Sequence, residues 1–159
     1  MKHFLTLLWG LLVLCLASCD DQRVYESNVE LPQKMWLSDS VLHFQFKVES
    51  SKTRYNLYYN IRNTLSYPFQ NLYIRYSLQD DQGNLVQKDL VNQVLFDPKT
   101  GRPFGSGLGD IFDHQFLLID DYKFERAGVY DFSIQHYMRP DTLTEVMAVG
   151  VRLEKAKEG

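Results

Sequence analysis

Apolar and polar side chains alternate with a period of two along most of the chain after residue 41. The alternation is clearest in the segments 42–48, 55–61 and 72–78, where every second residue is apolar. In a β-strand, this period directs one set of side chains to a buried face and the other set to water. We therefore predict that these three segments are half-buried strands.

Weaker forms of the same signal follow. Residues 79–84 include Gly83, which can take a positive φ, and are predicted to form a turn. Residues 85–90 then return as a hairpin partner, which residues 91–96 continue or bend. Residues 97–109 contain two prolines and four glycines, a composition that predicts a loop. Further strands are predicted at 115–119, 129–138 and 146–153.

The spacing of these segments defines a fold class. No segment shows the 3.6-residue period of an amphipathic helix. Seven or eight short strands separated by turn signals predict an all-β domain over residues 41–159, an antiparallel β-sandwich of the Ig-like or jelly-roll-like kind. Tyr130, after a predicted corner, is expected either to bond its hydroxyl to the preceding backbone or to be an ordinary core residue.

The first nineteen residues carry a different pattern. A short basic start precedes an apolar run at residues 4–16, which has the length and flanks of a signal peptide rather than a membrane span. Ala17, Ser18 and Cys19 follow, and this segment resembles a bacterial lipobox. We predict that residues 1–18 are a cleaved signal peptide and that Cys19 becomes the lipidated N-terminus. The alternatives are an uncleaved membrane anchor and an ordinary signal peptide with an incidental cysteine.

Residues 19–40 are interpreted as the lipidated N-terminus and a polar tether that leads to the domain. Acyl chains on Cys19 would hold the protein on a membrane, because each buried CH2 contributes about 0.8 kcal/mol. The other cysteine, Cys15, lies in the leader and would be removed. We therefore expect neither a disulfide nor a catalytic cysteine in the processed chain.

Composition narrows the function classes. The 159 residues are 45% hydrophobic and 14% aromatic, which is typical of a folded domain and not of a disordered chain. Lys and Arg number 17 against 20 Asp and Glu, a net charge of -3. A nucleic-acid partner is not expected, because such proteins present a basic face.

The histidines are not at metal-ligand spacing, and no metal site or cofactor is predicted. His43 lies on a polar strand phase and is expected to be exposed. His136 lies on an apolar phase and is expected to be a hydrogen-bonded core residue. His114 is also expected to be structural, with ion binding as its alternative.

The chain shows no catalytic constellation. Gly105, Gly107 and Gly109 match neither a nucleophile elbow nor a dinucleotide fingerprint. Four carboxylates near this loop lack the pattern of an EF-hand, although a calcium role is conceivable for Asp110, Asp113, Asp120 and Asp121. We predict that the protein is not an enzyme, and a hydrolase that uses paired carboxylates is the weakest alternative.

Two sets of residues are candidates for contact with a partner or ligand. Tyr58, Tyr73 and Tyr137 lie off the apolar phases of their strands, and they would share one face if their strands were neighbours. Exposed rings on a sheet suit stacking on sugar rings or contact with a protein. Ordinary cross-strand stabilisation of a solvated sheet is the alternative.

The second set is the glycine-rich loop. Gly105, Gly107 and Gly109 precede Asp110 there. Binding residues concentrate on loops, so this loop is the candidate for a functional contact with a partner or ligand.

Several segments resemble the gliding-motility lipoprotein GldH family of the Bacteroidota. The resemblance rests on Cys19-Asp20 and on residues 55–63, 67–73, 105–111, 128–139 and 149–154. It implies a lipoprotein that is needed for gliding in the family members that move over surfaces. The gliding apparatus of those bacteria is tied to a secretion system that spans the envelope. It supplies neither a catalytic activity nor a ligand.

The predicted function is therefore a non-catalytic lipoprotein of the cell envelope with protein partners from a gliding or secretion complex. A carbohydrate-binding lipoprotein that uses exposed tyrosines is the alternative. The periplasmic face or the surface of the outer membrane is favoured over the inner membrane, and Asp20 and Asp21 are compatible with surface export.

Overall fold

A computed structural model describes residues 22–157, and antiparallel β-strands make up most of that range. The strands are β1 (Arg23–Glu30), β2 (Met35–Leu37), β3 (Leu42–Val48), β4 (Arg54–Thr64), β5 (Asn71–Gln79), β6 (Leu85–Val94), β7 (Ser106–Leu108), β8 (Ile111–Lys123), β9 (Gly128–His136), β10 (Thr142–Thr144) and β11 (Val146–Lys155). A short 3-10 turn, η1 (Pro32–Lys34), joins β1 to β2.

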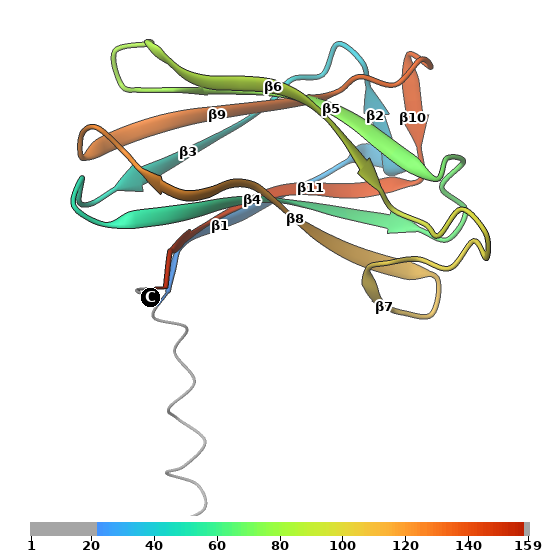
Figure 1. The fold of residues 1–159 in the computed structure, drawn as a ribbon. Coiled ribbons are helices and arrows are strands. Elements are labelled where there is room, and N and C mark those ends of the chain that lie inside the picture. The colour runs from blue at the N-terminus through green and yellow to red at the C-terminus, as the bar shows by residue number, and fades with distance from the viewer. Residues whose placement is uncertain (1–21, 158–159) are drawn as a thin grey trace, which may run out of the picture.

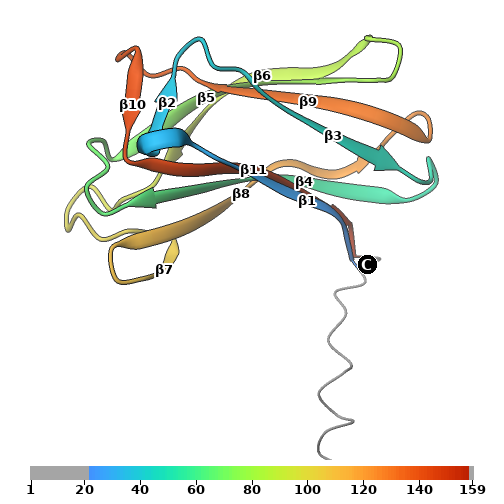
Figure 2. The ribbon, with the colours of Figure 1, turned by 180° about the vertical axis from the view of Figure 1, so that it is seen from behind.

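Two sheets lie face to face and form the sandwich (Figure 1, Figure 2). The larger sheet has five strands in the order β1-β11-β4-β8-β7, and the smaller has four in the order β3-β9-β5-β6. A two-stranded ribbon of β10 and β2 stands at one end of the sandwich. The predicted all-β antiparallel sandwich is confirmed.

Alternation in the sequence becomes burial in the structure. In β5, for example, Leu72, Ile74 and Leu78 have no exposed surface, whereas Tyr73 and Arg75 between them face water. The inner phases of both sheets meet in one apolar core. Each strand therefore has one outward-facing row of side chains, and these rows are available for function.

Aromatic rings connect the two sheets near one end of the core. Phe124, which follows β8, packs edge-on against Tyr130 of β9 at 4.6 Å and against Tyr55 of β4 at 5.6 Å between ring centroids. Such ring pairs contribute about 0.5–1.5 kcal/mol beyond the area they bury. The Tyr130 hydroxyl also donates to the Arg126 carbonyl at 2.8 Å, so the predicted corner bond is confirmed and the ring is part of the core as well.

The polar segment predicted to be a tether contains structure. Residues 23–30 form β1, which pairs with β11 from Glu26↔Arg152 to Glu30↔Ala148. The prediction of a tether up to residue 40 is therefore wrong over residues 23–30. The alternation of apolar and polar residues is weak there, because Ser27 takes one of the inner positions, and pairing with β11 compensates for it. The predicted signal peptide and Cys19 lie outside the described residues.

Three other short strands were also absent from the sequence prediction. The strands β2, β7 and β10 have three residues each, and β7 lies within the predicted loop at 97–109. Three residues are too few to show a period. β7 forms against the longer strand β8, whereas β2 and β10 satisfy each other's backbone groups. Together with β1 they raise the number of strands from the predicted seven or eight to eleven in residues 22–157.

The start of β1 and the end of β11 lie side by side at one edge of the sandwich (Figure 1). The Lys155 N–H donates to the Gln22 carbonyl at 2.8 Å. Gln22, the third residue after Cys19, is therefore already part of the fold.

Candidate functional site

The three candidate tyrosines lie on two different sheets. Tyr73 of β5 and Tyr137, which directly follows β9, share the outer face of the four-stranded sheet, where the Tyr137 N–H donates to the Tyr73 carbonyl at 2.7 Å. Tyr58 lies in β4 of the five-stranded sheet and faces the opposite side. The expectation that all three rings share a face is therefore wrong, because the phase of a strand does not reveal the sheet to which it belongs.

The outer face of the four-stranded sheet is ordered in rows by the strand register. Tyr73 and Tyr137 form an aromatic row, and the next row has Leu90, Arg75 and Gln135 opposite one another. A third row contains Lys88, Ser77 and Ser133. We call the surface made by these eight residues the tyrosine face.

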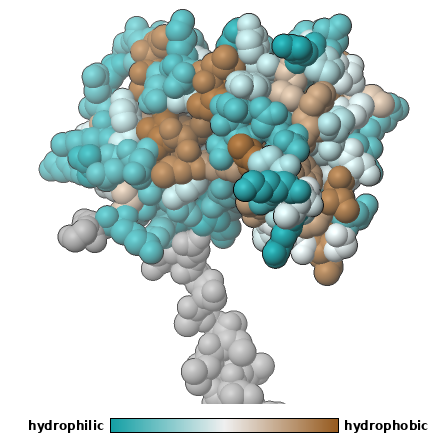
Figure 3. Space-filling view, turned by 45° about the vertical axis from the view of Figure 1, so that its right-hand side comes forward, coloured by the Kyte–Doolittle hydropathy of each residue, from teal (hydrophilic) through white to brown (hydrophobic). Residues whose placement is uncertain are grey.

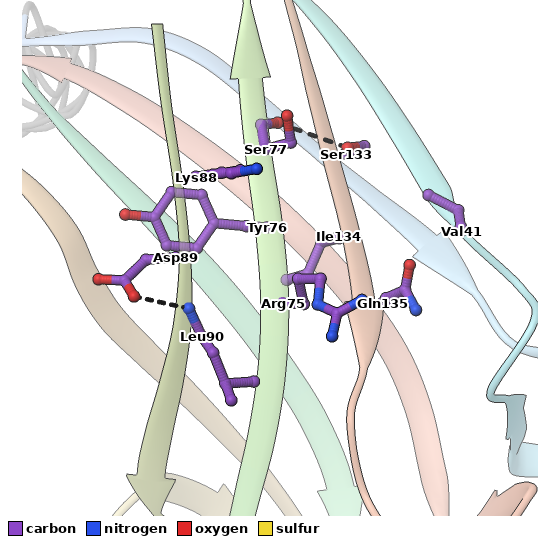
Figure 4. A pocket seen from close by; sticks show the side chains of 10 residues that line it. All are labelled: Val41, Arg75, Tyr76, Ser77, Lys88, Asp89, Leu90, Ser133, Ile134 and Gln135. Atoms are coloured by element: carbon purple, nitrogen blue, oxygen red, sulfur yellow. Dashed lines mark hydrogen bonds between the residues drawn. The ribbon is translucent and has the colours of Figure 1, made fainter. Parts of the chain in front are cut away.

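A hollow opens in the tyrosine face above its two serines. Its volume is about 390 Å³, which lies within the range of small-molecule sites. Figure 4 shows Lys88 reaching from β6 toward Ser77, and Arg75 beside Gln135. The hollow exists because Ser77 and Ser133 are directly paired across β5 and β9, so two small side chains lie among larger ones.

The two cations of the tyrosine face have no carboxylate partner within residues 22–157. Arg75 instead places its guanidinium carbon 4.2 Å from the centre of the Tyr137 ring, a cation–π contact. Asp89 also borders the hollow, but its carboxylate accepts from the Leu90 N–H at 2.7 Å and points away from β5 (Figure 4). The hollow therefore has an excess of positive charge.

The outer face of the five-stranded sheet differs in its bonding. Arg152 pairs with Glu26 at 3.2 Å and also with Glu154, and Arg62 donates to Asp113 at 2.8 Å. The Asp113 hydrogen bond and charge raise the pKa of Arg62. Between the two ion pairs, the Gln115 side chain donates to that of Asn60 at 3.1 Å. We call this surface the ion-pair face, defined by Glu26, Asn60, Arg62, Asp113, Gln115, Arg152 and Glu154.

The glycines of the predicted contact loop have structural roles. A Cβ on Gly105 would lie 2.5 Å from the Asp113 carbonyl oxygen, and a Cβ on Gly107 would collide with the Ile111 carbonyl. Gly109 has a φ of +67° in the two-residue turn between β7 and β8. Gly105 and Gly107 allow the chain to lie close against β8, and Gly109 allows the turn.

The apolar side chains on the same hairpin are the exposed feature. Leu108 next to the turn is 91% exposed, and Phe104 before β7 is 61% exposed. Leu65, 52% exposed, is held beside the turn because its N–H donates to the Asp110 carbonyl at 2.8 Å. Leu108 and Phe104 were not among the residues predicted to contact a partner. The signal that could have identified them is the presence of two large apolar residues within a glycine-rich loop.

Two histidines are buried on the inner sides of the sheets. His136 is 1% exposed, and its Nδ1 accepts from the Met138 N–H at 3.3 Å, which confirms the predicted bonded core histidine. His114 is 3% exposed and stacks on Phe116 at 5.7 Å. Burial lowers the pKa of both imidazoles, which are therefore held in their neutral form. His43 is exposed, as predicted, and its Nδ1 lies 3.1 Å from the Oδ1 of Asp131.

Within residues 22–157, no group of three or more His, Cys, Asp and Glu side chains is arranged to hold a metal ion. The carboxylates considered for calcium are used elsewhere or lie apart: Asp113 binds Arg62 and Asp121 binds Arg54. The described part of the chain also lacks a helix long and apolar enough to span a membrane.

The fold is an all-β sandwich domain with ion pairs across one outer sheet face and a cationic hollow on the other. The sequence model of the family described as GldH lipoprotein matches residues 23–153. The chain therefore belongs to the GldH lipoprotein family and is a gliding-motility-associated lipoprotein of the cell envelope.

Relatives agree over nearly the whole chain. Gliding motility lipoprotein GldH of Flavobacterium johnsoniae is 30% identical over 156 residues, which cover 92% of this chain and 95% of that protein. A gliding motility lipoprotein GldH homolog of Christiangramia forsetii is 29% identical over 151 residues, 91% of each chain.

One solved structure with a related outline is a carbohydrate-binding module, CBM28, specific for non-crystalline cellulose. It has 8% sequence identity and a TM-score of 0.46 over 84% of this chain and 75% of the module. This likeness is too slight to support a conclusion about fold or function.

Proposed function

We propose that this protein is a non-catalytic docking component of an envelope complex that serves gliding motility or a related secretion system. The observation that carries the proposal is Leu108, which is 91% exposed at the tip of the β7–β8 hairpin. Two close backbone approaches at Gly105 and Gly107 fix this hairpin against the sheet. A rigid apolar tip binds a partner with little loss of conformational entropy.

The surrounding surface supports a defined contact. Figure 3 turns the β7 end of the molecule forward and shows apolar surface in separate patches among hydrophilic surface. Phe104 and Leu65 accompany Leu108 at this end. An interface built on a few exposed apolar anchors with a polar rim has the anatomy of a specific, non-obligate protein contact.

We further propose that Cys19 carries the lipid and that the domain lies close to the membrane, on the periplasmic face or the surface of the outer membrane. Gln22 already bonds to Lys155 within the fold. Three extended residues span at most about 11 Å. The anchor therefore restricts the height of the hairpin above the membrane as well as its location.

The docking proposal is tested by crosslinking in cells that carry the full-length lipoprotein, followed by mass spectrometry of the attached proteins. Leu108→Glu is expected to remove at least one envelope protein from the crosslinked set. The matched control is Leu85→Glu, because Leu85 is a 51% exposed leucine at the start of β6, outside the β7–β8 hairpin. Identical crosslinked sets for both variants would reject the hairpin as the docking site.

Anchoring is tested separately with Cys19→Ala, which removes the only sulfur positioned for lipidation. We expect uncleaved precursor or loss of the protein, and loss of motility or secretion. The same domain exported without its lipid is expected to fold but not to restore function. Restoration by that soluble form would show that tethering is dispensable.

A second candidate function is saccharide binding on the tyrosine face. It is favoured by one observation, the hollow of about 390 Å³ bordered by Arg75, Ser77 and Gln135, next to the exposed rings of Tyr73 and Tyr137. Rings stack on sugar faces, and the polar side chains bond hydroxyl groups. Calorimetry with a panel of neutral and acidic oligosaccharides tests it, and Tyr137→Ala is expected to weaken any binding observed.

A further inference from the structure

We infer that the tyrosine face binds an acidic saccharide, a chain of sugar rings that bears carboxylates. This inference rests on the second candidate function and names its ligand class.

The central strands exclude a peptide strand as the occupant. In the order β3-β9-β5-β6, both β9 and β5 have hydrogen-bonded neighbours on each side. Their backbone groups are therefore used, whereas extended peptides bind sheets through free edges. Only side chains are available above Ser77 and Ser133, and a ligand there must be recognised by stacking, hydroxyl bonding and charge.

The cations determine the sign of that charge. Arg75 and Lys88 border the hollow, and neither pairs with a carboxylate in the described chain. Asp89 is occupied by a backbone N–H, and Asp131 on β9 faces His43. Two unneutralised cations beside two hydroxyl groups form a site for an anionic oxygen group.

The row order explains why the ligand is a sugar acid and not a small anion. Neighbouring outward residues of a strand are about 6.6 Å apart, so the aromatic row and the serine row are about 13 Å apart. A small anion would bridge only part of this length. An oligosaccharide can stack on the exposed ring of Tyr73, or on the side of the Tyr137 ring opposite Arg75, while a carboxylate farther along its chain reaches Lys88 and a nearer one reaches Arg75.

Arg75 is suited to this task because it is already oriented. Its guanidinium lies 4.2 Å from the Tyr137 ring centre, so the side chain is held without the neutralisation that a salt bridge would bring. A guanidinium can donate two parallel hydrogen bonds to a carboxylate while one of its faces rests on a ring. Binding therefore requires little reorganisation of this residue.

The test uses the full-length lipoprotein in detergent micelles and calorimetric titration with hexagalacturonate. The fully methyl-esterified hexagalacturonate, which has the same rings without charge, is the neutral comparison. The acidic form is expected to bind at least about tenfold more tightly, since hydrogen bonds to charged groups contribute about 1.5–3 kcal/mol. Raising NaCl from 0.05 to 0.5 M is expected to reduce that advantage.

Three substitutions locate the site. Arg75→Gln and Lys88→Gln are each expected to weaken binding of the acidic form about tenfold and binding of the neutral form by a clearly smaller factor. Lys47→Gln is the matched control, because Lys47 lies on the outer phase of β3 in the same sheet but does not border the hollow. All three side chains are exposed, and circular dichroism checks that each variant folds.

The outcomes separate this inference from the function on which it rests. Equal binding of the acidic and neutral forms, insensitive to Arg75→Gln, would overturn the acidic ligand and leave saccharide binding standing. Binding of neither form would overturn both. Preferential binding of a polyglutamate peptide or of phosphatidylglycerol vesicles over hexagalacturonate would also overturn the inference, and would assign the cations to a protein or a membrane.

Discussion

The two outer faces of the sandwich are built from the same kinds of residue, yet their charges are used differently. On the ion-pair face, Arg152 bonds to Glu26 and Glu154, and Arg62 bonds to Asp113. On the tyrosine face, Arg75 and Lys88 have no acidic partner among residues 22–157, and small residues leave a hollow beside them. A surface whose charges are neutralised within the fold gains little by binding a ligand, whereas unpaired charges beside a hollow retain that capacity.

The difference has a geometric basis in the registers of the two sheets. Directly opposed residues on neighbouring strands interact, and opposite charges in such pairs are favourable. The register places Arg152 opposite Glu26 and Arg62 opposite Asp113. In the four-stranded sheet, Arg75 instead meets Leu90 on one side and Gln135 on the other. The charge available for binding therefore depends on which strands are neighbours.

The largest expected effect on stability comes from adding a side chain at Gly150, on the outer side of the five-stranded sheet. A Cβ on Gly150 would collide with the Asn28 side chain and lie 2.8 Å from the Ser27 carbonyl oxygen. Gly150→Ala is expected to lower the free energy of unfolding by about 1–3 kcal/mol. Ser133→Ala on the tyrosine face is expected to stay within about 0.5 kcal/mol. Urea denaturation measures both, and equal effects would contradict the tighter packing of the ion-pair face.

The next effect concerns pH and the histidine behind each face. Burial lowers the pKa values of His114 and His136, so the unfolded chain takes up their protons first as the pH falls. The two neutral histidines therefore contribute their full stability above pH 6.5, which is about the pKa of histidine in the unfolded chain. Below that pH the free energy of unfolding falls by up to about 1.4 kcal/mol per pH unit for each proton that the unfolded chain takes up.

Urea denaturation at several pH values between 7.5 and 5 measures this loss. His136→Asn is expected to reduce it, because an Asn oxygen can still accept from the Met138 N–H but does not titrate in this range. Stability that stays constant down to pH 5 would show that neither imidazole is held neutral.

A smaller effect distinguishes the charges of the two faces directly. Arg152→Gln removes the cation that Glu26 and Glu154 share, although Glu26 keeps its pair with Arg23, and is expected to cost about 1 kcal/mol of unfolding free energy. Arg75→Gln is expected to change stability by less than about 0.5 kcal/mol, because it breaks no ion pair. A larger loss for Arg75→Gln would mean that its contact with Tyr137 is structural.

The smallest expected effect is that of Tyr58→Ala on oligosaccharide binding. Tyr58→Ala is expected to leave oligosaccharide binding unchanged, because Tyr58 lies on the five-stranded sheet opposite Arg152. Tyr137→Ala, by contrast, removes the ring under Arg75 and is expected to weaken binding of acidic and neutral forms alike. The same calorimetric titration compares them, and weaker binding by Tyr58→Ala would require a second site.

The site was only partly predictable from the sequence. Strand phase predicts the exposure of Tyr73 and Tyr137, and the concentration of binding residues on loops favours the glycine-rich loop. The structure shows that Gly105 and Gly107 are needed for close approach to β8, while Leu108 is the exposed group. Sequence reasoning could not separate these roles, because both depend on which backbone lies opposite the loop.

The sequence by itself determined the all-β class, the long strands, the buried and exposed phases within them, and the corner at Tyr130. Each of these depends on side chains a few residues apart in one strand, which a period of two records. Only the tertiary structure decided that residues 23–30 join the sheet, that Tyr58 faces away from Tyr73, and that Arg75 lies opposite Leu90 and Gln135 instead of a carboxylate. These features depend on the neighbours and the register of each strand, and they are decided by contacts between residues distant in the chain, which the local alternation does not encode.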